Sequence, residues 1–236
     1  HGILGPDEMV GAAPRLFSHM ERLEPIRCHG SWDGEAVAGE LARRLAERGC
    51  VVTYNHPIWS RVEPDEFCGA EGYFALEIFN YDTVNESGTG YDVTYWDLML
   101  RRGRRVLGFA SDDNHNEGLF DDAFGGWVIV RAPELSRDAI VRALLAGDYY
   151  SSSGPELLSW GVEAGRVWVE CSPCERVNLV AGGPVNAGGT VIAQAGTEGL
   201  THAEFELRGG ETYLRVECVD ARGRTAWSNP AFADEA

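Results

Sequence analysis

The chain has 236 residues, of which 44% are hydrophobic and 24% charged, a composition typical of globular proteins. No apolar run approaches the roughly 20 residues that cross a bilayer, so we expect no membrane partner. The formal net charge of −17 argues against a nucleic-acid polymer as partner, because such binding depends largely on Lys and Arg. An acidic surface suits a site for divalent cations, although it also serves simply for solubility.

The six cysteines are widely spaced, which favours reduced thiols in a cytoplasmic protein over a disulfide framework. One C-x-x-C motif, Cys171-Ser-Pro-Cys174, has no second pair and is therefore weak as a zinc or redox motif. The chain begins at His1 with neither Met nor a basic and apolar leader, so we expect no signal peptide and a fragment of a longer protein.

Up to residue 150, short apolar runs alternate with helical patterns. Residues 33–49 place Val37, Leu41 and Leu45 on one helix face, with Asp33 as expected N-cap and Gly49 as terminator. The remaining expected elements are strands at 51–57, 73–80, 105–111 and 125–132, and helices at 95–103 and 135–147, the last capped by Ser136 and ended by Gly147. Alternating strands and helices predict an α/β domain over residues 1–153, built on a parallel sheet or barrel.

After residue 153 the hydrophobic pattern changes to period two. Val167, Val169 and Cys171 lie on one side of an expected strand, and similar runs occupy 176–182, 203–209 and 212–220, with a turn at Gly223. The pattern predicts a small antiparallel β-sandwich over residues 154–236.

Polar side chains follow three of the expected strands. His56 lies at the end of the first, Glu77 and Asn80 end the second, and Asp113 and His115 come after the third. Because parallel strands end on one face, these groups are expected to meet. A carboxylate and an imidazole together suit Zn, Mn or Fe, but a solvated turn equally favours Asp and Asn, and a His before a proline has a structural alternative.

The segments YNHP, ALEIFN and FASDDNHN, together with residues 125–156, resemble the later part of a PHP (polymerase and histidinol phosphatase) domain, in its predicted metal-dependent phosphoesterase branch. The resemblance implies an N-terminally truncated, distorted (β/α)7 barrel that binds up to three divalent metal ions and hydrolyses phosphate esters. The family's opening His-x-His motif would precede residue 1.

On that pattern His56, Asp113 and His115 match metal ligands, and His1 matches another, unless it is the remnant of a purification tag. In the same hypothesis Asp112 is the candidate catalytic residue. Asn80 and Glu77 are candidates for orienting the ligands or contacting a small phosphorylated metabolite or nucleotide. Two alternatives stay open: a degenerate barrel that binds a ligand without catalysis, and a metal-dependent hydrolase of carbon–nitrogen bonds. The oligomeric state is left open.

Overall fold

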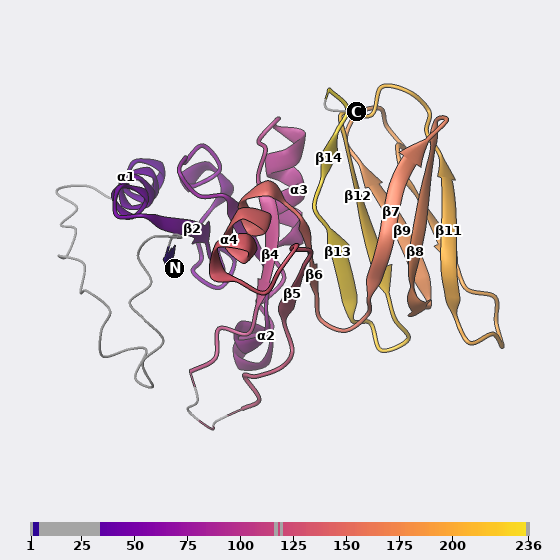
Figure 1. Cartoon of the computed structure of the whole chain (residues 1–236), viewed down its shortest axis with the longest axis horizontal. Coiled ribbons are helices and arrows are strands. Elements are labelled where there is room, and N and C mark those ends of the chain that lie inside the picture. The colour runs from indigo at the N-terminus through magenta and orange to yellow at the C-terminus, as the bar shows by residue number, and fades with distance from the viewer. Residues whose placement is uncertain (1, 5–33, 116–117, 119, 235–236) are drawn as a thin grey trace.

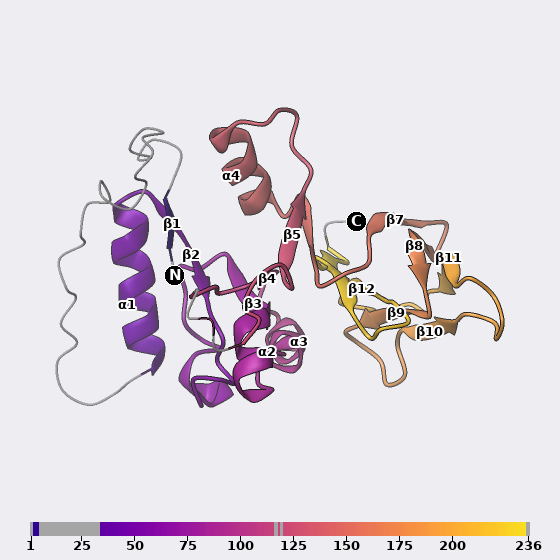
Figure 2. The ribbon, with the colours of Figure 1, turned by 90° about the horizontal axis from the view of Figure 1, so that it is seen from below.

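The computed structural model describes residues 2–4, 34–115, 118 and 120–234. The helices and a small sheet lie at one end of the molecule, and antiparallel sheets lie at the other (Figure 1), a separation that Figure 2 shows from a second direction. The α-helices in the described residues are α1 (Gly34–Glu47), α2 (Tyr81–Ser87), α3 (Val93–Arg101) and α4 (Arg137–Ala146). None of them is long and apolar enough to cross a membrane.

The first sheet has the order β1-β2-β3-β4, with β2, β3 and β4 parallel and β1 antiparallel to β2. Its strands are β1 (Gly2–Leu4), β2 (Cys50–Tyr54), β3 (Ala75–Asn80) and β4 (Leu107–Ser111). Every residue of β3 is buried, as expected for a central strand covered on both faces. The predicted helix at 33–49 is confirmed as α1, although Asp33 lies outside the described residues.

The second sheet is antiparallel and has the order β10-β9-β12-β13-β6-β5, with β14 added beside β12. A third, three-stranded sheet has the order β11-β8-β7. Their strands are β5 (Trp127–Val130), β6 (Tyr149–Ser152), β7 (Leu157–Glu163), β8 (Arg166–Cys174), β9 (Arg176–Ala181), β10 (Gly189–Ile192), β11 (Leu200–Glu206), β12 (Tyr213–Val219), β13 (Thr225–Ser228) and β14 (Ala231–Phe232). Inward side chains of the two sheets share one hydrophobic core.

The predicted (β/α)7 barrel is wrong. Strands predominate over helices, and the parallel run among the described strands stops at β4, because the next strand, β5, pairs antiparallel with β6. At the opposite edge of the sheet lies β1, which pairs antiparallel with β2. Three parallel strands with such neighbours form an open sheet, since a barrel requires every strand to pair on both sides.

The seven-stranded sheet lies between the other two and packs against both. Its outer face carries Tyr213 and Trp227, which belong to the same hydrophobic cluster as Phe79 of β3 and Trp96 of α3. We call the first sheet with its helices the α/β part. Strands β5 and β6 precede the predicted domain boundary at residue 153, yet they are hydrogen-bonded into this sheet. The division into residues 1–153 and 154–236 therefore stays a prediction.

Candidate functional site

A pocket of about 330 Å³ lies beside the segments that follow the three parallel strands. His56 follows β2, Asp82 follows β3, and Asp113 and His115 follow β4; all four line the pocket, together with Asp122. The volume is at the lower end of the range for small-molecule sites. The convergence expected from parallel strand ends thus holds for this open sheet.

His56 and Asp113 lie next to each other in the lining of the pocket. His56 Nε2 lies 3.7 Å from Asp113 Oδ2, and the two side chains are 20% and 15% exposed. Burial lowers the pKa of His56, although the charge of Asp113 opposes the shift. Both residues have left-handed backbone angles, with φ of 36° and 54°. Such angles are unfavourable for residues with a Cβ, and strained residues of this kind are frequent at functional sites. The backbone angles therefore support the choice of this pair as candidate site residues.

Glu77 binds His56 directly and is linked to Asp113 through Asn80. The side chain is fully buried, and it accepts hydrogen bonds from the His56 backbone N–H at 3.0 Å and from Ser111 Oγ at 2.5 Å. Asn80 Nδ2 bridges the two acids, donating to Glu77 Oε2 and to Asp113 Oδ2, each at 3.0 Å. Burial raises the pKa of Glu77 to about 7, against the lowering effect of these donors. Glu77 and Asn80 therefore orient the pocket residues.

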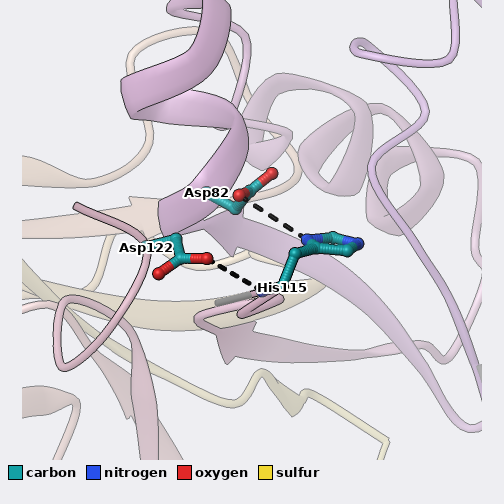
Figure 3. Close-up of side chains that lie close together, drawn as sticks. All are labelled: Asp82, His115 and Asp122. Atoms are coloured by element: carbon teal, nitrogen blue, oxygen red, sulfur yellow. Dashed lines mark hydrogen bonds and ion pairs between the residues drawn. The ribbon is translucent and has the colours of Figure 1, made fainter. Parts of the chain in front are cut away.

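Asp82, His115 and Asp122 form a second group in the pocket (Figure 3). Each offers one ligand atom, and these atoms all lie within 4.8 Å of one another. His115 Nδ1 is 3.7 Å from Asp82 Oδ1, and the His115 backbone N–H donates to Asp122 Oδ2 at 2.8 Å. Two carboxylates and one imidazole form a donor set that suits Zn, Mn or Fe.

Asp112 has a different environment from its neighbour Asp113. Its carboxylate accepts backbone hydrogen bonds from Phe124, Gly125 and Gly126 at 2.7 to 2.8 Å. These contacts fix the turn that leads into β5. The geometry favours a structural function for Asp112, and its catalytic role stays a prediction.

The pocket is strongly acidic. No Lys or Arg is among its lining residues in the described part of the chain, whereas four carboxylates and two imidazoles are. Burial raises the pKa of Asp82, and the charges of Asp113, Glu86 and Asp122 add to the rise while His115 opposes it. A bound cation would relieve this repulsion, because it favours the charged form of every carboxylate around it.

The structure brings His56, Asp113 and His115 into one pocket, with Asn80 and Glu77 directly behind it. The predicted ligand His1 lies outside the described residues. Sequence reasoning missed Asp82 and Asp122. Asp82 had a usable signal, because it comes two residues after the end of β3, whereas nothing marked Asp122 as different from the adjacent Asp121.

Comparisons with protein-family models, with curated proteins and with solved structures give no match. The resemblance to the PHP family therefore stays a prediction.

Proposed function

We propose that the pocket binds a divalent metal ion and that the protein is a metal-dependent phosphoesterase. The observation that carries the proposal is the convergence of His56, Asp82, Asp113, His115 and Asp122 on one cavity. The fit to a cation rests on the donor set of Asp82, His115 and Asp122 and on their spacing within 4.8 Å.

The acidic lining supports a cation-dependent mode of phosphate binding. A phosphate group would be repelled by Asp82, Asp113 and Asp122, and no basic side chain among the described lining residues offsets them. A phosphate ester is therefore expected to bind only after the metal. This order of binding distinguishes the site from one built on Arg or Lys.

A divalent ion bound here would supply Lewis-acid stabilisation of the phosphate and a water of lowered pKa. The residues of the chain would hold the ion and orient the side chains around it. Asp82, His115 and Asp122 would hold the ion, and His56 and Asp113 are candidates for further ligands. Glu77 fixes the His56 backbone, and Asn80 fixes the Asp113 carboxylate.

The proposed substrate is a small phosphorylated metabolite or nucleotide, in keeping with the size of the cavity. A cytoplasmic location is part of the proposal. It is supported by the buried thiols of Cys68, Cys171, Cys174 and Cys218, which are free rather than disulfide-bonded.

Metal titration tests the first step. We expect His115→Ala and Asp82→Asn to weaken Mn²⁺ or Zn²⁺ binding, measured by isothermal titration calorimetry. The affinity should fall by at least roughly 10- to 100-fold, which is the usual loss when a residue that only orients a metal ligand is removed. His202→Ala is the matched control. This histidine lies on β11 and pairs with Glu170 and Glu204 outside the pocket.

Hydrolysis of p-nitrophenyl phosphate and of nucleotides with added Mn²⁺ or Zn²⁺ tests the second step. Turnover that requires metal and is lost in His115→Ala supports the phosphoesterase. Metal binding without turnover of any phosphate ester favours a non-catalytic binding protein, and turnover of amides alone favours a carbon–nitrogen hydrolase. Equal metal binding by the unmodified protein and both pocket variants would refute the site.

A further inference from the structure

Three cysteine side chains lie together in the core between the two antiparallel sheets. Cys171 and Cys174 belong to β8, and Cys218 belongs to β12 of the facing sheet. They are 2%, 1% and 0% exposed and belong to one hydrophobic cluster. The proposed phosphoesterase makes no use of them.

A strand irregularity brings the two cysteines of β8 to the same face. In a regular strand, residues three apart point to opposite faces. The register between β8 and β11 shifts between Leu200 and His202, and Cys171 and Cys174 are both buried as a result. The isolated C-x-x-C motif thus acquires two inward thiols.

The third thiol comes from the facing sheet. Directly after Cys174 the chain crosses to the other sheet, where the Glu175 backbone N–H donates to the Val219 carbonyl at 2.8 Å. Val219 is the neighbour of Cys218 in β12, so this hydrogen bond ties Cys218 to the end of β8. A third cysteine distant in sequence therefore joins the C-x-x-C pair.

Hydrogen bonds among the three thiols shift their pKa values. Cys174 and Cys218 lower the pKa of Cys171, and Cys171 in turn raises the pKa of each of the other two. Cys68 offers a contrast, because burial raises the pKa of its thiol. The thiolate is the reactive form of cysteine, and each sulfur of the cluster has two further thiols of the same core beside it.

We propose that Cys171, Cys174 and Cys218 form an oxidation site that closes one internal disulfide on reaction with hydrogen peroxide. One thiol of the cluster attacks one peroxide oxygen, the O–O bond breaks, and a sulfenic acid and water form. A second thiol of the cluster attacks this sulfur, the S–O bond breaks, and a second water leaves. Two thiols and one peroxide thus become one disulfide and two waters, while the third cysteine stays reduced.

Thiol counting on the folded full chain tests the proposal. The protein is treated with hydrogen peroxide, quenched, unfolded and alkylated. We expect two of the six thiols to be lost, the mass of the unalkylated chain to fall by about 2 Da, and peptide mapping to place the bond within the cluster. Six alkylated thiols, a bond to Cys50 or Cys68, or sulfinic acid without a disulfide would each overturn it.

Two variants sharpen the result. Cys68→Ala removes a buried thiol outside the cluster and should still lose two thiols, whereas the triple variant Cys171→Ala/Cys174→Ala/Cys218→Ala should lose none. If the triple variant does not fold, peptide mapping of the unmodified chain decides. Because the thiols are buried, oxidation should be slow and should accelerate in mild urea, as expected for attack through local opening.

Discussion

Asp92 is a buried carboxyl group with incomplete hydrogen bonding. It is 0% exposed; Oδ1 accepts from the Ile58 N–H at 2.9 Å, while Oδ2 has no hydrogen-bond partner among the described residues. Burial raises its pKa to about 7, and the charge of Glu77 adds to the rise. The folded protein therefore binds a proton between pH of about 4 and 7 that the unfolded chain releases.

The stability of the protein is therefore expected to depend on pH through Asp92. Because the folded state holds more protons in this window, the free energy of unfolding falls as the pH rises from about 4 to 7. Asp92→Asn removes this contribution, so the variant should lose less stability than the unmodified protein over the window, by on the order of 1 to 4 kcal/mol. Urea denaturation at a series of pH values measures it.

Asp220→Asn provides the opposite case. Burial raises the pKa of Asp220, but hydrogen bonds from the Arg224 side chain and backbone outweigh it, so the net pKa is lowered. Its contribution to stability is present at neutral pH and lost in acid. The control variant should therefore be less stable than the unmodified protein at pH 7 and approach it on acidification. Parallel pH profiles for Asp92→Asn and the unmodified protein would contradict the assignment.

At the residue scale, the sequence predicted candidate positions better than roles. His56, Asp113 and His115 could be found because each follows an apolar run that ends beside the pocket. The contacts of Asp112 could not be predicted in this way. Its carboxylate binds the backbone of residues 124–126, a contact between loop segments that no spacing rule reveals.

At the scale of elements, Asn80 joins β3, α2 and the pocket. It is the N-cap of α2, where its Oδ1 accepts from the Thr83 N–H at 2.9 Å, and its Nδ2 serves Glu77 and Asp113. Asn80→Ala removes the cap, worth about 1 kcal/mol, and takes one hydrogen-bond donor from each of Glu77 and Asp113, at a cost of roughly 1 to 3 kcal/mol. We expect chemical denaturation to show a total loss of about 2 to 4 kcal/mol.

Ser136→Ala is the matched control, because Ser136 caps α4 by accepting from the Ala139 N–H at 3.2 Å without contacting the pocket. It should cost only about 1 kcal/mol. Equal losses for both variants would show that the Asn80 side chain serves the helix alone.

Local patterns identified most long elements but not their pairing. Ser136 and Gly147 bound α4 as expected, with Gly147 at φ 78°. The seven-residue helix α2 was missed, because it is too short for a helical period to stand out. Strand β5 was expected correctly near 125–132, but only the whole fold determines that it pairs with β6 rather than with β4.

At the scale of the whole molecule, the α/β part and the antiparallel sheets meet through a buried interface. The ring centroids of Trp227 of β13 and Phe79 of β3 are 5.6 Å apart. Arg215 of β12 stacks over Trp96 of α3, with its Cζ 4.8 Å from the ring centroid. Tyr213 also hydrogen-bonds Asp97 across this interface. Such contacts join residues more than 100 positions apart, so neither hydrophobic period could predict them.

This interface should make the two parts unfold together. Trp227 is 3% exposed and belongs to the cluster that contains the α/β core, so Trp227→Ala should lower the free energy of unfolding by about 3 to 5 kcal/mol. Leu158→Ala is the control, because Leu158 is 65% exposed on β7 and its loss should cost less than about 0.5 kcal/mol. Circular dichroism and tryptophan fluorescence should report the same urea midpoint in the unmodified protein, since one shared core couples both parts. Two separate transitions, with only the antiparallel sheets weakened by Trp227→Ala, would show instead that the interface adds little and that the parts are independent.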